Sequence, residues 1–408
     1  MVSGAAHPMV VVTGIGLVAP HGDNPHAVFD AVMRAASAVQ PVFPELSRPV
    51  AAAVAPFDAA HWFTKLQLPG VDRVSQIAVA AASLALRDAG ALDAAPERVG
   101  VYAGCGMGGA AALEAAYAAG LRGGRVPPLT VPAFMPNAPA AHIAMRHGVL
   151  GPVLTYSVAC ASSAVALAEA ARAVRRGDVD VAIAGGAEAL IVPGVVSAWQ
   201  ALQTLASFKP GEAASACRPF ASDRSGFVLG EGAAFVVLES AQRARQRGGR
   251  AYAELAGCGI SNDATHLTKP DVQGQARALR AALADAGLEP RDVGYCNAHG
   301  TAAKIGDMVE SGALNAVWGA AIDDLRVSST KALHGHLLGA AGALEAAITV
   351  LALHRQQLPP NAHCTAPDSH CALNLVLEPG ARAPNLQVAI SSSFAFGGTN
   401  AVLAFKRV

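Results

Sequence analysis

Two stretches of this sequence, far apart along the chain, repeat one pattern. Residues 82–106 read ASLALRDAGALDAAPERVGVYAGCG, and residues 277–300 read RALRAALADAGLEPRDVGYCNAHG. Both have an alanine- and leucine-rich run, then Asp-Ala-Gly, a proline a few residues later, and Val-Gly before a short apolar segment. Such a glycine ends a helix in a left-handed cap, and the proline beyond it does not continue the helix. A spacing of about 200 residues is too long for a solenoid repeat. The pattern therefore predicts two similar α/β halves.

We place the boundary between these halves at residue 250, which gives an N-terminal half over 1–250 and a C-terminal half over 251–408. Strands are expected at 9–18 and 179–189 in the first half, and at 251–260 and 387–405 in the second. Residues 226–239, GFVLGEGAAFVVLE, are typical of a β-hairpin with GEG as its turn. Strands that alternate with alanine-rich helices predict a sheet covered by helices, and their unbroken apolar runs indicate burial on both faces.

Composition and charge narrow the class of protein. Hydrophobic residues make up 52% and charged residues 15% of the chain, below the usual quarter for charged residues, which predicts a large core and a subunit interface. The formal net charge is zero, so nothing indicates binding to nucleic acid or to a membrane surface. Residues 1–16 have no basic region before their apolar run and are not read as a secretory signal.

Two further observations concern membranes and redox environment. Residues 148–168 carry no charge and are long enough to span a bilayer, but their glycine, proline and hydroxyl residues and their change of periodicity favour a buried core segment. The seven cysteines are odd in number and have no tight framework spacing, which fits a reducing cytoplasm.

Cys160 ends a strand-like run and opens an alanine-rich helical run, TYSVACASSAVALAEAARAV. Two interpretations are open for this residue. It is a small core side chain, as free cysteines commonly are, or it is a nucleophile whose thiolate the following helix stabilises. This stretch alone favours the core interpretation.

Three other stretches place polar residues or glycines just after expected strand ends: 297–310, 328–347 and 391–402. In open α/β folds, sites form at such ends. His299 and His336, taken singly, are each interpreted as structural histidines. The duplication changes this interpretation, because equivalent strand ends of two fused halves can meet in one cleft. A cysteine of one half would then face two histidines of the other.

The chemistry of such a cluster is coherent. A thiolate is a good nucleophile, and an imidazole exchanges a proton or donates a hydrogen bond to a developing oxyanion. Lys331 and Glu345 flank His336 by five and nine residues, where they would fix its tautomer or charge, or form an ordinary surface ion pair. The glycines of FGGTN, residues 396–400, either bring backbone N–H groups close to a ligand or form a tight hairpin turn.

Six motifs in order carry a family resemblance over essentially the whole chain. They are VACASSAV, AGGAEA, RPFASDRSGFVLGEGAA, NAHGT with Asp307 and Glu310, TKALHGHLLGAAGALEA and SFAFGGTNAV. Together they resemble the β-ketoacyl–acyl carrier protein synthases of the elongating, type II kind. The resemblance implies an α/β protein of the thiolase-like fold, with two duplicated halves stacked in five layers, α-β-α-β-α.

The resemblance implies an acyltransferase that performs a decarboxylative Claisen condensation. Cys160 would take an acyl group from an acyl carrier protein as a thioester. His299 and His336 would act on a malonyl thioester, whose decarboxylation leaves an enolate. That carbanion would attack the acyl group on Cys160 and give a β-ketoacyl product longer by two carbons, in fatty-acid or polyketide biosynthesis.

Further roles are implied in the same way. The backbone N–H groups of Cys160 and Phe396 would form the oxyanion hole, and Phe396 would also gate access. Lys331 would organise the site and Glu345 would support it. The implied substrate-binding residues are Thr301 against the phosphopantetheine arm, Met107 in the acyl pocket, and Phe394, Gly397, Gly398 and Asp307. No metal and no cofactor are implied beyond the phosphopantetheine of the carrier. The implied partners are the carrier and a second subunit, in a homodimer or a heterodimer with a related chain.

The sequence departs from the family pattern at six positions: Ala303, Ala332, Ala395, Ser225, Pro69 and Gly70. Alanine at 303 removes one hydroxyl that would contact the pantetheine arm, worth on the order of 1 kcal/mol. Pro69 and Gly70 replace a basic pair that would help to receive an acidic carrier. These departures favour a secondary-metabolism or accessory enzyme over the housekeeping fatty-acid enzyme.

Three other hypotheses concern the function of the chain and a metal site. A biosynthetic thiolase or an initiating synthase shares the fold, but pairs its cysteine with His and Cys or with His and Asn. A non-catalytic chain-length-factor partner also shares the fold and lacks the nucleophile. Cys160 argues against it, whereas the altered residues at the pantetheine and docking positions keep it open. The stretch AHCTAPDSHC places His363-Cys364 and His370-Cys371 seven residues apart, in the manner of zinc ligands. Two adjacent pairs on one loop rarely converge tetrahedrally, so a metal site is not favoured there.

Overall fold

The computed structural model describes residues 8–46 and 49–408. The first seven residues of the N-terminal segment 1–16, in which no secretory signal is read, lie outside the described residues. Eleven strands of the described residues form one sheet, in the order β12-β11-β10-β13-β14-β9-β1-β8-β6-β4-β5. The N-terminal half supplies β1 (Val10–Val18), β4 (Val99–Gly104), β5 (Val153–Tyr156), β6 (Val181–Glu188) and β8 (Gly232–Ser240). The C-terminal half supplies β9 (Ala253–Asn262), β10 (Tyr295–Asn297), β11 (Arg326–Ser328), β13 (Val388–Phe394) and β14 (Thr399–Lys406), with β12 (Asn374–Leu375) at its edge.

The two halves of the sheet have the same connectivity. Numbered along the chain within each half, the strands lie in the spatial order third, second, fourth, fifth, first. In both halves the third, second and fourth strands are parallel, and the fourth, fifth and first are antiparallel. The halves join where β9 pairs with β1 at Val11–Glu254 and Val12–Ala253. This symmetry confirms the duplication that the repeated sequence pattern predicts.

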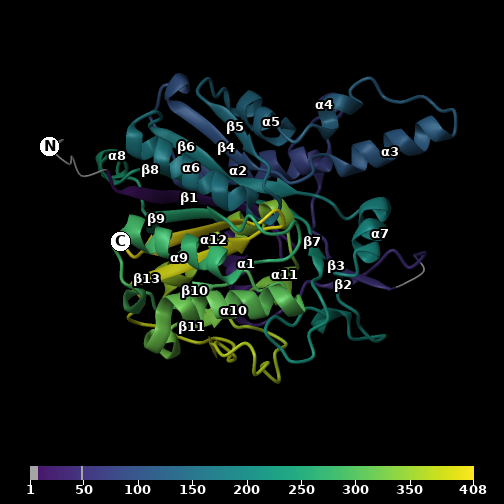
Figure 1. The fold of residues 1–408 in the computed structure, drawn as a ribbon. Helices are drawn as coiled ribbons and strands as arrows, with labels where there is room; N and C mark the ends of the chain where they lie inside the picture. Colours follow the sequence, from purple (N-terminus) through teal and green to yellow (C-terminus); the bar gives the residue numbers. More distant parts are fainter. Residues whose placement is uncertain (1–7, 47–48) are drawn as a thin grey trace.

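Helices complete the five layers (Figure 1). Helices α2 (Arg73–Ala89) and α5 (Ala138–His147) cover the outer face of the first half. Helices α9 (Val272–Ala286) and α10 (Lys304–Trp318) cover the outer face of the second half. Helices α6 (Ser162–Arg176) and α12 (Ala341–Arg355) pack against each other and against both halves of the sheet. The predicted α-β-α-β-α architecture is confirmed.

The remaining elements surround this core. They are the helices α1 (Pro25–Met33), α3 (Ala110–Leu121), α4 (Thr130–Phe134), α7 (Pro193–Ala201), α8 (Ala241–Gln246) and α11 (Lys331–His334), and a small sheet of β2 (Gln40–Val42), β3 (Val50–Ala53) and β7 (Leu229–Gly230). Helix α3 and the loop that joins it to α4 project from the body as an arm (Figure 1).

The repeated Asp-Ala-Gly ties each outer helix to the first strand of its own half. Gly90 and Gly287 end α2 and α9 with positive φ angles of 74° and 61°. The carboxylate of Asp88 accepts a hydrogen bond from the Ile15 N–H at 2.9 Å, and the carboxylate of Asp285 accepts one from the Cys258 N–H at 2.8 Å. The motif therefore joins an outer helix to the first strand through one aspartate hydrogen bond, once in each half.

The expectation of a β-hairpin over 226–239 is wrong. Strand β7 pairs with β3 in the small sheet, whereas β8 pairs with β1 and β6 in the main sheet. Between them the buried Glu231 points away to an ion pair with Arg73, with 2.6 Å between Nη2 and Oε1. Gly232 has a φ of 156°, and a Cβ there would lie 2.6 Å from the Val18 carbonyl oxygen. The chain therefore crosses from one sheet to the other instead of folding back.

One segment of the described chain, Leu338–Arg355, is apolar and long enough to cross a membrane by length and composition, and 89% of it is buried inside the protein. It contains α12 of the central layer, whose apolar character follows from packing between two sheets. Residues 148–168, which the sequence also offered as a span, are divided between β5 and the start of α6.

Candidate active site

Cys160 and His336 are each placed by one of two equivalent 3₁₀ turns: the first contains Cys160 and the second follows His336. Cys160 is the middle residue of a 3₁₀ turn, Ala159–Ala161, that leads from β5 into α6. His336 lies just before a second 3₁₀ turn, Leu338–Ala340, that leads into α12. Each turn begins with a non-glycine residue at positive φ, 49° at Ala159 and 48° at Leu338. Such backbone is costly and is common at functional sites.

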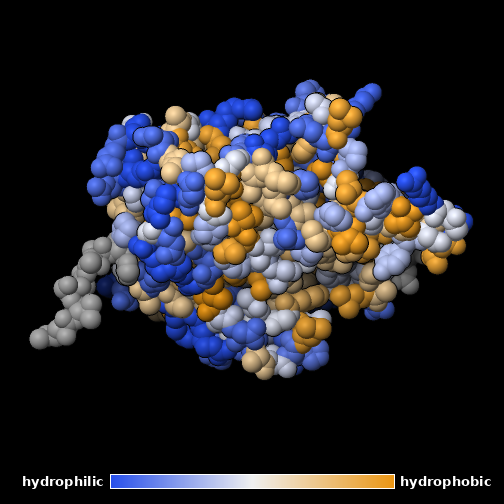
Figure 2. All heavy atoms as spheres, turned by 90° about the horizontal axis from the view of Figure 1, so that it is seen from above, coloured by the Kyte–Doolittle hydropathy of each residue, from blue (hydrophilic) through white to orange (hydrophobic). Residues whose placement is uncertain are grey.

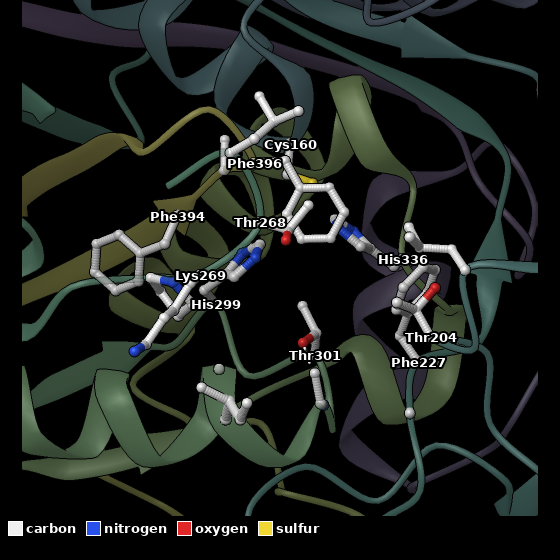
Figure 3. Close-up of a pocket in the computed structure, with 18 of the residues that line it drawn as sticks. Cys160, Thr204, Phe227, Thr268, Lys269, His299, Thr301, His336, Phe394 and Phe396 are labelled. Atoms are coloured by element: carbon white, nitrogen blue, oxygen red, sulfur yellow. Dashed lines mark hydrogen bonds between the residues drawn. The ribbon is translucent and has the colours of Figure 1, made fainter. Parts of the chain in front are cut away.

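The structure brings Cys160, His299 and His336 together. The sulfur and one nitrogen of each imidazole lie within 4.8 Å of one another. The two ring centroids are 5.4 Å apart and the ring planes are nearly perpendicular, at 82°. Figure 3 shows both rings pointing from the elements of the C-terminal half toward the cysteine. The convergence expected from the duplication is therefore present.

This trio is the one group of three or more potential metal ligands that gathers within the described ranges. A Cys-His-His set suits zinc. Burial, and after it the positive charge of nearby Lys331, lowers the pKa of both imidazoles, and that charge also opposes a cation beside them. The residues of AHCTAPDSHC are engaged elsewhere. His363 Nδ1 lies 3.3 Å from the Cys217 carbonyl oxygen, and His370 pairs with Asp368. Cys364 and Cys371 pack into the outer core.

A cavity of about 430 Å³ opens onto the trio. Of the residues expected to bind substrate or catalyse, seven line it: Cys160, His299, His336, Thr301, Phe394, Phe396 and Gly398. Lys331 and Glu345 lie behind it, fully buried. Met107, Gly397 and Asp307 do not line it.

Both active-site histidines are neutral near pH 7. Burial lowers the pKa of His299 and of His336 well below 6.5, and the charge of Lys331 lowers them further. The Leu338 backbone N–H donates to His336 Nδ1 at 3.3 Å. Because a peptide N–H only donates, the proton of neutral His336 resides on Nε2, which is buried and has no hydrogen-bond partner among the described residues. His336 therefore presents an N–H donor to the site.

The structure corrects one sequence expectation about Cys160. Burial raises the pKa of its thiol to about 11, although Lys331 and the backbone N–H groups of Phe396 and Cys160 act in the opposite direction. The helix terminus therefore does not produce a resting thiolate, because desolvation outweighs it. The two N–H groups nevertheless converge on the sulfur, which is where the oxygen of a thioester on Cys160 would need donors.

Lys331 and Glu345 form an ion pair at the base of the site, and both side chains are fully buried. This arrangement rules out the surface ion pair that the sequence left open. Burial raises the pKa of Glu345 to about 7, and the ammonium of Lys331 limits that rise. Since neither residue lines the cavity, Lys331 acts through its charge on the imidazoles and the thiol.

Asp307 and Glu310 support the loop that carries His299. Glu310 accepts hydrogen bonds from the His299 and Gly300 N–H groups, both at 2.7 Å. Asp307 accepts one from Phe220 at 2.8 Å and one from Ala302 at 3.1 Å, and is buried. Asp307 therefore lies beneath the loop, away from the cavity in which the sequence placed it.

Met107 and Gly397 also lie apart from the cavity. Met107 is 53% exposed on the protomer surface. Gly397 has a φ of 84°, and its N–H donates to the Leu267 carbonyl oxygen at 2.7 Å. Phe394 lines the cavity, with its ring centroid 6.1 Å from that of His299.

Sequence reasoning missed an aromatic wall of this cavity. The ring centroid of Trp199 on α7 lies 5.3 Å from that of Phe227 and 6.1 Å from that of Phe396. The edge of Phe227 in turn meets His336, at 5.6 Å between centroids. The sequence shows Trp199 in SAWQ and Phe227 in SGFV. Their spacing along the chain does not predict that the two rings are in contact.

Comparison with known proteins covers nearly the whole chain. The family described as beta-ketoacyl synthase, N-terminal domain, matches residues 8–244, and its C-terminal domain matches residues 252–365. "Nodulation protein E" of Rhizobium sp. (strain N33) is 41% identical over 98% of this chain and 99% of its own length. "3-oxoacyl-[acyl-carrier-protein] synthase 2" of Staphylococcus aureus (strain N315) is 36% identical over 98% of both chains. The solved structure "The ishigamide ketosynthase/chain length factor" superposes with a TM-score of 0.92 at 30% identity, over 99% of this chain and 100% of that one.

Proposed function

Because this chain belongs to the β-ketoacyl synthase family, we propose that it condenses acyl and malonyl groups held on acyl carrier protein, with Cys160, His299 and His336 as its catalytic residues. The observation that supports this proposal most directly is that these three side chains meet in one cavity of about 430 Å³. The reaction needs no cofactor besides the phosphopantetheine that delivers both substrates.

The first step transfers an acyl group to Cys160. Because burial keeps the thiol protonated, its proton must pass to a base as the sulfur attacks the thioester carbonyl. His336 already carries its proton on the nitrogen that faces the site, so His299 is the base. The N–H groups of Cys160 and Phe396 hold the oxyanion of the tetrahedral intermediate. The carrier thiolate then leaves and takes the proton from His299.

The second step uses the malonyl thioester. As the carbon–carboxylate bond breaks, the electron pair moves into the thioester carbonyl and forms an enolate. His336 donates Nε2–H to that oxygen. His299 provides a second donor in its other neutral tautomer, which carries the proton on the nitrogen that acted as the base in the first step. The enolate carbon then bonds to the acyl carbon on Cys160, and the sulfur leaves.

A direct test supplies the protein with acyl carrier protein that bears an acyl group and with malonyl carrier protein. We expect a β-ketoacyl carrier longer by two carbons, and transient label from a radioactive acyl group on Cys160. Mass spectrometry of the carrier and of the Cys160 peptide measures both. Absence of label, with or without a partner subunit, would contradict the proposal and support a non-catalytic chain-length-factor role.

The carrier is proposed to dock at the mouth of the cavity. Lys269 and Lys304 line that mouth and are exposed, and neither forms an ion pair with any residue that the structure describes. Acyl carrier proteins are acidic, so two free lysines compensate for the basic pair that Pro69 and Gly70 replace.

Charge reversal at these lysines tests the docking proposal. Lys269→Glu with Lys304→Glu is expected to raise KM for the carrier substrate by about tenfold and to weaken its salt dependence, because rim charges act mainly on association. Activity on a short thioester without carrier should stay within about twofold. Arg382→Glu, an exposed charge outside the cavity lining, is the control. Equal losses on both substrates would contradict docking.

We further propose a dimer formed through an apolar face on the N-terminal half. Exposed apolar side chains gather there on the arm, on the end of α5 and on the edge strand β5: Tyr117, Leu121, Val131, Met145, Leu150 and Leu154. Figure 2 shows apolar side chains exposed over this half and along the projecting arm at the right. The partner is a second copy or a related subunit, and the cytoplasm is the proposed location.

A further inference from the structure

Glu188 is a buried carboxylate that the proposed mechanism does not use. It is the last residue of β6 and is fully buried. No basic side chain pairs with it anywhere in residues 8–46 and 49–408. Instead it accepts three backbone hydrogen bonds, from Gly106 at 2.7 Å, Met107 at 3.2 Å and Gly339 at 3.0 Å. An uncompensated buried carboxylate is costly unless such donors hold it.

The cradle around this carboxylate is closely fitted. A Cβ on Gly106 would lie 2.5 Å from Glu188 Oε2, and the next nearest atom belongs to the same carboxylate, at 3.5 Å. A Cβ on Gly339 would overlap the same oxygen. Two backbone segments thus approach Glu188 as closely as only glycine allows, one after β4 and the other after His336.

The duplication explains what this cradle is. Cys160 and Gly339 occupy equivalent places, since each is the middle residue of a 3₁₀ turn that opens at positive φ and leads into a central helix. In the first half, the middle residue is Cys160 itself, whose side chain lines the cavity. In the second half, the N–H of Gly339 donates to Glu188. The turn that corresponds to the cysteine turn is therefore held in place by the Glu188 carboxyl group.

We propose that Glu188 is a positioning residue for His336, an inference that rests on the proposed function. The turn that Glu188 holds by Gly339 is the same turn whose Leu338 N–H fixes His336 Nδ1. Leu338 sits at a φ of 48°, a conformation that relaxes unless its surroundings hold it. Without the carboxylate, the Gly339 N–H loses its acceptor, the turn shifts, and the Nε2–H of His336 no longer points at the malonyl oxygen.

This inference separates the two half-reactions. Acyl transfer depends on Cys160, His299 and the N–H groups at Cys160 and Phe396, and Glu188 forms no hydrogen bond with any of them in the described structure. After burial, the charge of Glu188 also raises the pKa of the Cys160 thiol, so its removal does not slow acyl transfer through that thiol. Decarboxylation depends on His336. A merely structural Glu188 would lower both rates together, whereas a positioning residue lowers decarboxylation selectively.

The experiment measures both half-reactions in Glu188→Ala, which removes the acceptor of the Gly339 N–H, as label transfer from an acyl carrier to Cys160 and as release of carbon dioxide from malonyl carrier. We expect decarboxylation to fall by about 10- to 100-fold, the scale of a misaimed catalytic group, while acyl transfer stays within about threefold. Gly106→Ala displaces the carboxylate from the opposite side without removing it, and is expected to give the same pattern. Glu239→Ala is the matched control, because Glu239 is equally buried but lies at the far end of β8, where it pairs with Arg247.

Each outcome decides between these possibilities. Equal losses in both half-reactions, or no loss in decarboxylation, would overturn the positioning role. If Glu188→Ala does not fold, Gly106→Ala decides. A wild-type protein that performs neither half-reaction would instead refute the proposed function, so the two failures are distinguishable.

Discussion

The substitution Cys160→Ala is expected to abolish condensation. Turnover should be at least about 1,000-fold below the wild type, the scale seen when a catalytic nucleophile is removed. No other thiol lines the cavity in the described structure, and Thr301, the hydroxyl among the expected site residues there, lacks the two converging N–H groups that surround the sulfur. Label from an acyl carrier should disappear from the protein altogether. Peptide mass spectrometry and a steady-state assay measure the two effects.

The same variant should still release carbon dioxide from malonyl carrier. His299 and His336 hold their positions through the Glu310 and Leu338 backbone contacts, which do not involve the sulfur. Cys258→Ala, a buried cysteine on β9 outside the cavity, is the control for loss of a thiol in general. Condensation that survives in Cys160→Ala would contradict the assignment of the nucleophile.

Local patterns allowed much of the fold to be predicted. The Asp-Ala-Gly repeat predicted two equivalent halves because each copy performs the same local task, ending a helix and clasping a strand through Asp88 or Asp285. The strand ends at Cys160, His299 and His336 were likewise predictable, because sites in α/β folds gather at such ends. The helix end that each glycine makes is local, whereas the strand residue that each aspartate contacts lies 73 or 27 positions away and could not be named from the motif.

The features that sequence reasoning missed depend on contacts distant along the chain. GEG at 230–232 looked like a hairpin turn, but Glu231 is drawn to Arg73, 158 positions away. The resting charge of Cys160 could not be read from its helix, because desolvation by the rest of the protein dominates its pKa. Asp307 has the polarity of a ligand-binding residue, yet its backbone donors on Phe220 and Ala302 fix it beneath the loop. Glu188 belongs to the motif AGGAEA, but the motif alone did not indicate a role for it, since its partners come from both halves.

The second large effect is expected at His336. His336→Ala should lower malonyl decarboxylation by about 100- to 1,000-fold, the range found when one oxyanion donor is removed. His336→Gln should recover about tenfold of that loss, because its amide places an N–H near the position of Nε2 while its acceptor oxygen does not occupy the Nδ1 position that the Leu338 N–H contacts. Acyl transfer to Cys160 should change little in either variant, which serves as the internal control.

The pH dependence of these variants separates hydrogen-bond donation from proton transfer. Glutamine does not titrate, so the ratio of the wild-type to the His336→Gln decarboxylation rate follows the protonation of His336 alone. Burial lowers the pKa of His336 well below 6.5, so the imidazole stays neutral as the pH falls and takes up a proton only in more acidic solution. The ratio should therefore be constant from about pH 8 to about pH 6.5. A ratio that changes with a midpoint near 6.5 would mean that His336 titrates like an exposed histidine, and that a protonated imidazole, not the neutral Nε2–H, meets the enolate.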